Sequence, residues 1–200
     1  MPRRRPKATP HSPDRRDGEV RIIGGKWRSR KLPFQSADGL RPSSDRLRET
    51  LFNWLSPYLG GARCLDLFAG SGALGLEALS RGAAHCDFVE KNPGSAEQIR
   101  RHLHTLQCED GSVHGRSAES YLKVADGGWH IVFLDPPFKQ SLLPIAVEAL
   151  KGKLAEDALI YVETAKGEAF VPPNDWQEHR HKSAGQVEYR LYRLSPDEVD

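Results

Sequence analysis

The segment Asp135-Pro136-Pro137-Phe138 has the groups needed to hold an amine. It follows the apolar run 129–134, which is typical of a buried strand. Two successive prolines withhold their N–H groups, so carbonyls beside the Asp135 carboxylate can accept hydrogen bonds from an NH₂ group. Phe138 can lie flat against a planar base. Two acceptors on a conjugated amine would turn its lone pair toward a methyl sulfonium, so position and electrostatics would do most of the catalysis.

A glycine-rich turn gives a second candidate site. Gly70, Gly72 and Gly75 follow a buried-strand pattern with the spacing G-x-G-x-x-G. Glycines at such a turn let a ligand approach the backbone and open the next helix. Asp66 precedes these glycines, and Glu90 ends the next expected strand, where a carboxylate can bind ribose hydroxyls.

Two classes of cofactor fit this turn unequally. The glycine spacing suits a dinucleotide pyrophosphate, and a carboxylate such as Glu90 also occurs in NAD-binding sheets. Asp66, however, would place negative charge at the loop where a pyrophosphate must lie, whereas that charge is favourable beside the cationic sulfonium of S-adenosylmethionine. We therefore expect S-adenosylmethionine, with NAD as the alternative. We expect no metal, because the eight histidines form no H-x-x-x-H or H-E-x-x-H pattern.

Alternating patterns predict the elements that position these segments. The expected order is strand 63–69, helix 73–81, strand 85–90, helix 93–106, strand 112–115, helix 117–124, strand 129–135, helix 140–151 and strand 158–163. Extended segments 176–181 and 186–194 predict an antiparallel hairpin on the sheet edge. The sequence thus predicts an α/β protein with a doubly wound, mostly parallel seven-stranded sheet, in which ligands bind at the carboxyl ends of the strands.

Composition divides the chain into three regions. Residues 1–19 are rich in proline and arginine and nearly without apolar side chains, which predicts a disordered basic arm. Residues 20–60 predict a small extension made of a β-hairpin and a helix that begins near Asp45. Residues 61–196 carry the expected sheet.

The net charge of +2 hides an asymmetry. Residues 1–50 carry 14 Lys and Arg against 6 Asp and Glu, a net charge of +8, so the rest of the chain has a net charge of −6. A basic end on an acidic body favours a polyanionic partner such as nucleic acid, with a solvated tail as the alternative. Trp27 stacks on an RNA base or anchors the hairpin. The candidates for phosphate contacts are Lys26, Arg28, Arg30, Arg41, Arg46 and Arg48.

Other features exclude whole classes of protein. No apolar run approaches the roughly 20 residues of a membrane helix, and no apolar segment follows the basic start, so we expect neither a membrane protein nor a secreted one. Cys64, Cys86 and Cys108 cannot all pair, and none are at CxxC spacing. We therefore expect a cytoplasmic protein without disulfides, with Cys64 and Cys86 in its core.

Together the two motifs resemble the class I S-adenosylmethionine-dependent amino-methyltransferases. Segments 21–32, 39–55 and 65–83 more closely resemble the bacterial 16S rRNA guanine-N2-methyltransferase family, and the likeness spans about residues 21–194. The block GLRPSSDRLRETLFNWL at 39–55 is specific, because generic methyltransferases lack it. The resemblance implies a Rossmann-like enzyme that methylates one guanine of small-subunit rRNA in a late, protein-containing assembly particle. We expect a monomer.

The resemblance also assigns roles to residues. Asp135 and the Pro136 carbonyl would hold the guanine N2, and Phe138 would stack on the flipped base. Many relatives of this fold have an aspartate at the turn that contacts adenine; Ser117 and Ala118 stand there in this chain, so we expect backbone contacts. The cofactor-binding residues implied are Asp66, Phe68, Gly70, Gly72, Glu90, Lys91, Ser117, Ala118 and Asp135.

Two other functions use the same residues. A DNA adenine-N6 methyltransferase would use the same acceptors, but such enzymes usually add a target-recognition domain, and only about 60 residues precede the first sheet strand. A non-catalytic RNA-binding assembly factor on the same fold is the second alternative. The complete set Asp66, Gly70, Gly72, Glu90 and Asp135 argues against a fold that has lost its activity.

Overall fold

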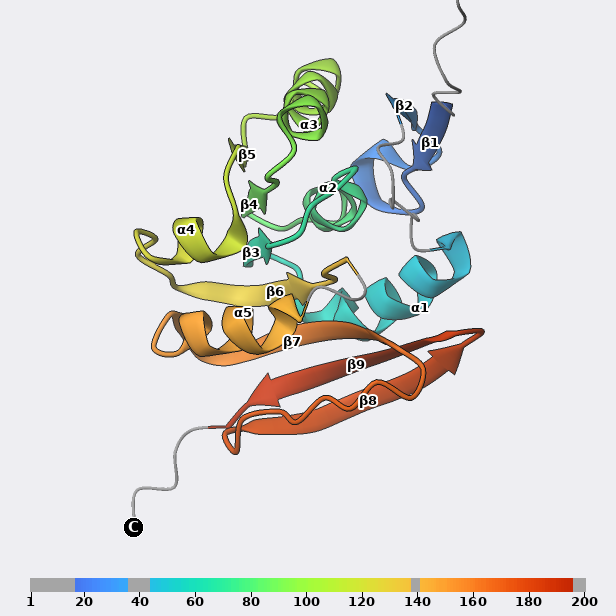
Figure 1. Cartoon of the computed structure of the whole chain (residues 1–200). Coiled ribbons are helices and arrows are strands. Elements are labelled where there is room, and N and C mark those ends of the chain that lie inside the picture. Colours follow the sequence, from blue (N-terminus) through green and yellow to red (C-terminus); the bar gives the residue numbers. More distant parts are fainter. Residues whose placement is uncertain (1–16, 36–43, 138–140, 196–200) are drawn as a thin grey trace, which may run out of the picture.

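One seven-stranded sheet forms the centre of the molecule (Figure 1). The computed structural model describes residues 17–35, 44–137 and 141–195. The sheet order is β5-β4-β3-β6-β7-β9-β8; β5 to β7 are parallel, and β9 and β8 are antiparallel to their neighbours. The strands are β3 (Arg63–Asp66), β4 (His85–Val89), β5 (Gly111–His114), β6 (Trp129–Leu134), β7 (Leu154–Ala165), β8 (Trp176–Ala184) and β9 (Val187–Leu194). The predicted sheet and its terminal hairpin are confirmed.

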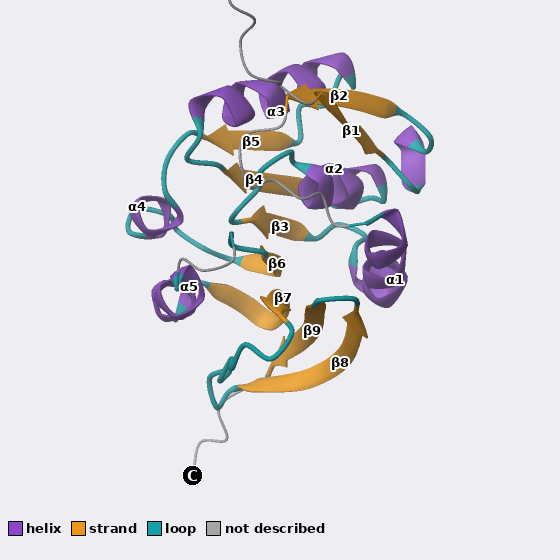
Figure 2. Cartoon of the chain, turned by 45° about the vertical axis from the view of Figure 1, so that its right-hand side comes forward, coloured by secondary structure: helices purple, strands orange, loops and turns teal. Residues whose placement is uncertain are grey.

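Helices cover both faces of this sheet (Figure 2). The helices α1 (Asp45–Leu55), α2 (Ala73–Ser80) and α3 (Pro93–Thr105) pack on one face, and α4 (Ala118–Leu122) and α5 (Leu142–Leu150) pack on the other. Each face has its own apolar core, with Phe133 and Tyr161 in the first and Val132 and Ile160 in the second. This alternation along β6 and β7 is the period of two that a fully covered strand requires.

Polar side chains begin three of the helices. The Ser44 hydroxyl accepts a hydrogen bond from the Leu47 amide at the start of α1. Asn92 does the same for α3, where Pro93 occupies the first turn, and Ser117 does so for α4. These are standard N-caps, and each fixes the residue at which its helix begins.

Two glycines of the predicted motif have distinct structural tasks. Gly72 has φ of +79° and precedes the first turn of α2, a backbone conformation that other residues seldom adopt. Gly75 lies within α2 where the helix passes β4, and a Cβ there would come within 2.2 Å of Phe88 Cε1. The third glycine therefore allows close packing between helix and strand.

The N-terminal hairpin joins the main core. It consists of β1 (Asp17–Arg21) and β2 (Lys31–Gln35) around a short 3₁₀ turn, η1 (Gly25–Trp27), and it lies beside α2 and α3 (Figure 1). The apolar side chains of both strands belong to the core under α1, α2 and α3. Since β1 begins at Asp17, the predicted boundary of the basic arm at residue 19 is wrong; residues 1–16 lie outside the described residues.

Trp27 anchors this hairpin. Its ring is half-buried against the core, and its amide donates a hydrogen bond of 3.0 Å to the Ser80 hydroxyl at the end of α2. The Lys26 ammonium lies 4.4 Å from the centre of the ring. Of the two interpretations of Trp27, the structural one is therefore supported.

A buried carboxylate attaches the hairpin to α2. Glu77 is fully buried and accepts hydrogen bonds of 2.8 Å from the amides of Ile23 and Gly24. The guanidinium of Arg81 lies 2.7 Å from the same carboxylate, and that of Arg48 lies 3.8 Å away. A buried charge is tolerated only when such partners surround it, so this cluster fixes the hairpin against α2.

Arg48 is part of this cluster, which corrects the prediction that it contacts RNA phosphates. Only 2% of Arg48 is exposed. Its Nη2 donates to the Arg21 carbonyl at 2.8 Å and to the Asp45 carboxylate at 2.7 Å, besides facing Glu77. Arg48 therefore connects α1, β1 and α2. The sequence placed it correctly on a helix but could not show that this face of the helix is covered.

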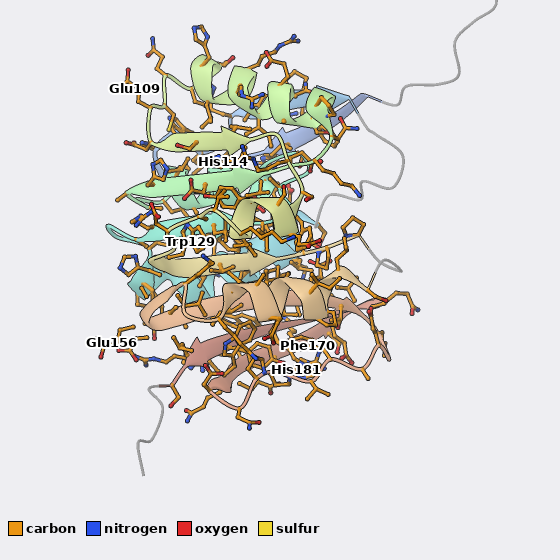
Figure 3. All side chains as sticks on the ribbon, turned by 60° about the vertical axis from the view of Figure 1, so that its left-hand side comes forward. Glu109, His114, Trp129, Glu156, Phe170 and His181 are labelled. Carbon is orange, nitrogen blue, oxygen red and sulfur yellow. The ribbon has the colours of Figure 1, made fainter. Side chains whose placement is uncertain are left out.

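A second buried carboxylate connects the parallel strands. Asp87 of β4 accepts hydrogen bonds of 2.9 Å from the Trp129 indole of β6 and the His114 imidazole of β5. Trp129 and His114 are labelled in Figure 3. Burial raises the pKa of Asp87, but the bonds from Trp129 and His114 outweigh it and hold the pKa below its usual value. Asp87 is thus a satisfied structural anion.

The remaining differences from the predicted elements are at their ends. β7 spans Leu154–Ala165 rather than 158–163, because it pairs with β6 from Leu154 and continues along β9 to Ala165. Cys64 and Cys86 are buried as predicted. Among the residues that the structure describes, no helix is long and apolar enough to cross a membrane.

Replacing Glu77 by alanine should lower the free energy of unfolding by about 3–5 kcal/mol, the usual cost of removing one partner of a buried ion pair. Arg48 would stay buried with one partner fewer, and the amides of Ile23 and Gly24 would lose their acceptor. Urea unfolding followed by circular dichroism measures the change.

The matched control is Glu97→Ala on α3. Glu97 is exposed and lies 3.6 Å from both Arg100 and Arg101. Exposed pairs of this kind contribute less than about 1 kcal/mol. Equal losses in the two variants would contradict the role assigned to Glu77.

Candidate active site

A cavity of about 610 Å³ opens at the carboxyl ends of the parallel strands. Its walls come from the segments that follow β3, β4, β5 and β6, from the end of β7, and from the turn of the β8–β9 hairpin. The chain order reverses between β3 and β6, which is the position where open α/β sheets bind ligands. The volume falls within the range of roughly 300–1,000 Å³ that is usual for small-molecule sites.

Strand register brings three carboxylates to one face of this edge. Asp66 ends β3 opposite Phe133 of β6, which in turn lies opposite Tyr161 of β7. Asp135 and Glu163 each come two residues further on, so all three share the face of the sheet that α1 and α2 cover. All three line the cavity.

Asp66 is held by the glycine turn. It is buried, and its Oδ2 accepts a hydrogen bond of 3.0 Å from the Gly75 amide at the start of α2. Burial raises the pKa of Asp66 to about 7; the Gly75 amide lowers it, and the nearby charge of Glu90 raises it further. A cation in the cavity would favour the ionised form.

Glu90 organises the turn on the other side. One carboxylate oxygen accepts from the Gly70 amide at 2.8 Å, and the other accepts from the Asn92 amide at 2.7 Å. These bonds join the turn after β3 to the turn after β4. Each oxygen has a second lone pair, so the carboxylate can still accept from the hydroxyls of a ribose.

Asp135 and Glu163 are neighbouring carboxylates that both line the cavity. Burial raises the pKa of Asp135 well above its usual range, and the charges of Glu163 and Asp66 raise it further. Glu163 is 7% exposed and accepts a hydrogen bond of 2.9 Å from the Tyr161 hydroxyl. Carboxylates crowded in this way favour ligands that bring positive charge or N–H donors.

The structure brings together most of the predicted cofactor residues. Gly72 does not line the cavity, since its task is to begin α2; its neighbours Ser71 and Ala73 do. Among the catalytic candidates, Pro136 lines it and Phe138 lies outside the described residues. The lining residues that were predicted are Asp66, Phe68, Gly70, Glu90, Lys91, Ser117, Ala118, Asp135 and Pro136.

Sequence reasoning missed the walls that distant segments supply. Phe34 of β2 and Leu47 of α1 come from the N-terminal extension, whereas Ala184, Gln186 and Val187 come from the hairpin turn. Gln186 flanks the hairpin turn and is a candidate from the sequence for contact with RNA, but the types of the other residues carry no signal of ligand binding. Only the packing of the extension and the antiparallel pairing of β9 with β7 place them at the cavity.

The predicted phosphate contacts occupy two separate places. Lys26, Arg28 and Arg30 are exposed, but η1 is bonded to Ser80 at the end of α2 away from the glycine turn. Ser80 is the last residue of α2, whereas the cavity is lined by Ala73 and Leu74 of its first turn, and Lys26, Arg28 and Arg30 are not among the lining residues. Arg46 is exposed on α1 between cavity-lining residues. Arg41 lies outside the described residues.

Comparison with known proteins identifies the family. The family model described as "Conserved hypothetical protein 95" matches residues 20–193. The ribosomal RNA small subunit methyltransferase D of Escherichia coli is 51% identical over 180 residues, which cover 88% of this chain and 90% of the relative. The protein of the same name from Haemophilus influenzae is 47% identical over 182 residues, 88% of this chain and 94% of the relative.

The chain belongs to this family of small-subunit ribosomal RNA methyltransferases. The resemblance predicted from its motifs is therefore confirmed, as are the class I methyltransferase fold and S-adenosylmethionine as cofactor. A solved methyltransferase structure from Escherichia coli superposes with a TM-score of 0.83 at 47% identity, covering 89% of this chain and 99% of that chain.

A more distant structure shares the fold. It is a Thermus thermophilus 16S rRNA guanine-N2 methyltransferase in complex with AdoMet and guanosine, with a TM-score of 0.67 at 19% identity, covering 95% of this chain and 53% of that chain. At this level of identity the likeness extends to the fold alone.

The side chains of the cavity fit S-adenosylmethionine. Buried Asp66 suits a positively charged end, Glu90 suits a ribose, and the apolar walls around Phe68 and Ala118 suit a planar ring. Within residues 17–35, 44–137 and 141–195, no group of three or more His, Cys, Asp or Glu side chains could hold a metal ion.

Affinity for S-adenosylmethionine should rise as the pH increases through about 7. Asp66, whose pKa is raised to about 7, then becomes ionised and attracts the cationic end of the ligand. Below this pH the affinity should fall by up to about tenfold per pH unit, because binding must remove a proton. Isothermal titration calorimetry between about pH 6 and about pH 8 measures the slope.

Asp66→Asn should flatten this pH dependence, and Asp110→Asn should leave it unchanged. Asp110 is an exposed aspartate between α3 and β5 and serves as the matched control. A slope that survives in Asp66→Asn would assign the titration to another group.

Proposed function

We propose that the protein transfers a methyl group from S-adenosylmethionine to the exocyclic N2 amine of a guanine in 16S rRNA. The substrate is the rRNA within an assembling small subunit in the bacterial cytoplasm, and the enzyme acts as a monomer. The observation that carries the proposal is the position of Asp135 and Pro136, which share one cavity with Asp66 and Glu90. The names of the relatives support small-subunit rRNA as the substrate.

Asp135 would act on the amine that receives the methyl group. The N2 lone pair of guanine is delocalised into the ring, so the nitrogen is a weak nucleophile. The Asp135 carboxylate and the Pro136 carbonyl would accept its two hydrogens and turn the lone pair toward the cofactor. S-adenosylmethionine supplies an electrophilic methyl group on a sulfonium. The amine must then lose one proton, and Asp135, whose pKa is raised by burial and by neighbouring anions, can accept it.

The cavity also favours the reaction electrostatically. Buried Asp66, beside the glycine turn, would stabilise a cationic methyl donor in the ground state. Asp135 and Glu163 would stabilise positive charge that develops on the attacking nitrogen. The proposed rate enhancement therefore comes from orientation and charge, without a covalent intermediate on the protein.

The RNA would contact the protein on both sides of the cavity mouth. Arg46 is exposed beside the cavity, so it can reach a phosphate near the target base. Lys26, Arg28 and Arg30 would contact RNA further from the target. We assign residues 20–60 to an RNA-facing extension and residues 61–196 to the methyltransferase domain. The basic arm is a further candidate contact, and its residues 1–16 lie outside the described part.

Asp135→Asn should slow methyl transfer in a single-turnover assay by about 10- to 200-fold. The substitution removes the negative charge and turns one acceptor into a donor that faces the amine. Affinity for S-adenosylmethionine should stay within about threefold of the wild type, because the loss is expected in the transition state. The assay uses labelled cofactor and small-subunit particles from cells that lack this gene, followed by mass mapping of methylated guanines.

The control for this variant is Asp126→Asn, an exposed aspartate in the loop before β6, which should retain the wild-type rate. An Asp135→Asn rate within about threefold of the wild type would remove Asp135 from the proposed mechanism. A methyl group found on a base other than guanine would overturn the proposed target.

Changing Lys26, Arg28 and Arg30 together to glutamine should weaken particle binding and leave the single-turnover rate at saturation unchanged. Each lost phosphate contact should lower the slope of log affinity against log salt by about 0.7 to 0.9. Filter binding at several salt concentrations measures the slope. The control for general loss of charge is the double variant Arg100→Gln and Arg101→Gln on α3. An equal effect of this double variant would contradict a specific role of Lys26, Arg28 and Arg30 in binding the particle.

A further inference from the structure

Glu163 lies next to Asp135 in the cavity. β6 and β7 pair in parallel up to Leu134 and Val162, and Asp135 and Glu163 are the next residues on each strand. Neighbouring strands are about 4.8 Å apart, so the two carboxylates arise side by side. Both line the cavity, and both lie on the face shared with Asp66.

Burial of Glu163 indicates that it has a task. It is 7% exposed, and a buried carboxylate is costly unless its environment compensates for the lost water. Glu163 accepts from the Tyr161 hydroxyl and lies in the cavity beside another carboxylate, Asp135. Two neighbouring carboxylates that line one cavity are well suited to binding hydrogen-bond donors.

The Watson–Crick edges of the bases differ in what they present to two neighbouring acceptors. Guanine presents the N1–H and the N2 amine side by side, which are two adjacent donors. Adenine and cytosine present an amine beside an unprotonated ring nitrogen, which would face the second carboxylate with a lone pair. A cationic cofactor in the cavity favours the ionised form of both carboxylates. Two ionised carboxylates in a row then match guanine and repel the other two amine-bearing bases.

We propose that Glu163 is a base-binding and specificity-determining residue, which accepts a hydrogen bond from the guanine N1–H while Asp135 accepts from the N2 amine. The inference rests on the proposed function, since it assigns a second contact to the same flipped base. Each carboxylate oxygen has two lone pairs, so Glu163 can accept from the base as well as from Tyr161.

The second contact gives this cavity a way to exclude adenine. An amine-binding aspartate followed by two prolines serves either base, because both carry an exocyclic amine. A site built to bind a donor rejects an analogue that lacks it much more strongly than an apolar pocket rejects a change in size. In this proposal Asp135 selects the atom that is methylated, and Glu163 selects the base that is bound.

The test compares guanosine with 2,6-diaminopurine riboside as competitive inhibitors of particle methylation. Both carry the 2-amine, but the N1 of diaminopurine has a lone pair in place of a hydrogen. The wild type should favour guanosine by at least about tenfold. In Glu163→Gln the side-chain amide can donate to N1 of diaminopurine, so the ratio of the two inhibition constants should fall by about tenfold or more.

Glu156→Gln is the matched control, because Glu156 is an exposed glutamate on the same strand, at the periphery of the molecule (Figure 3). Its ratio of inhibition constants should equal that of the wild type. Calorimetry with S-adenosylmethionine checks that Glu163→Gln is folded, which we expect since glutamine can still accept from Tyr161.

The outcomes separate this inference from the proposed function. A wild type that methylates guanine but does not discriminate between the two nucleosides overturns the role of Glu163 without any variant. So does an unchanged ratio in folded Glu163→Gln. A wild type that places no methyl group on guanine in the particle overturns the proposed function itself, and mass mapping of the rRNA shows which has failed.

Discussion

Crowding of like charges at the carboxyl edge of the sheet is the constraint around which this molecule is built. Parallel strand register puts Asp66, Asp135 and Glu163 on one face at one cavity. Burial raises the pKa of Asp66 and of Asp135, and neighbouring carboxylates raise both further, so ionising these groups costs free energy. A cationic cofactor and a base that presents donors would each lower that cost, which links binding of the two ligands.

Two other buried carboxylates of the described residues, Glu77 and Asp87, connect elements of the fold instead of lining the cavity. Glu77 is enclosed by two amides and two guanidinium groups, and Asp87 by an indole and an imidazole. Such anions hold elements together because the donors that surround them come from different elements of the fold. In the cavity, Asp66 accepts from the Gly75 amide and Glu163 from the Tyr161 hydroxyl, and both side chains line the space in which a ligand would bind.

The segments outside the parallel sheet complete the cavity. Glu77 and Arg48 fix the N-terminal hairpin and α1 against α2, which brings Phe34 and Leu47 to the cavity wall. On the opposite side, β9 pairs with β7 and carries the hairpin turn to the rim. The extension therefore has two different roles: Lys26, Arg28 and Arg30 are exposed and do not line the cavity, whereas Phe34 of β2 and Leu47 of α1 do.

Local sequence determined the strands, the helices, their caps and the two motifs, because hydrophobic period, capping residues and glycine turns act over a few residues. It therefore predicted Asp66, Glu90 and Asp135 at one edge of the sheet. Tertiary structure decided the rest. Arg48 could not be known as buried until α1 was packed against β1 and α2, and the place of Glu163 beside Asp135 depends on the register of β6 with β7. Register and packing arise from contacts between residues far apart in the chain, and no local pattern encodes them.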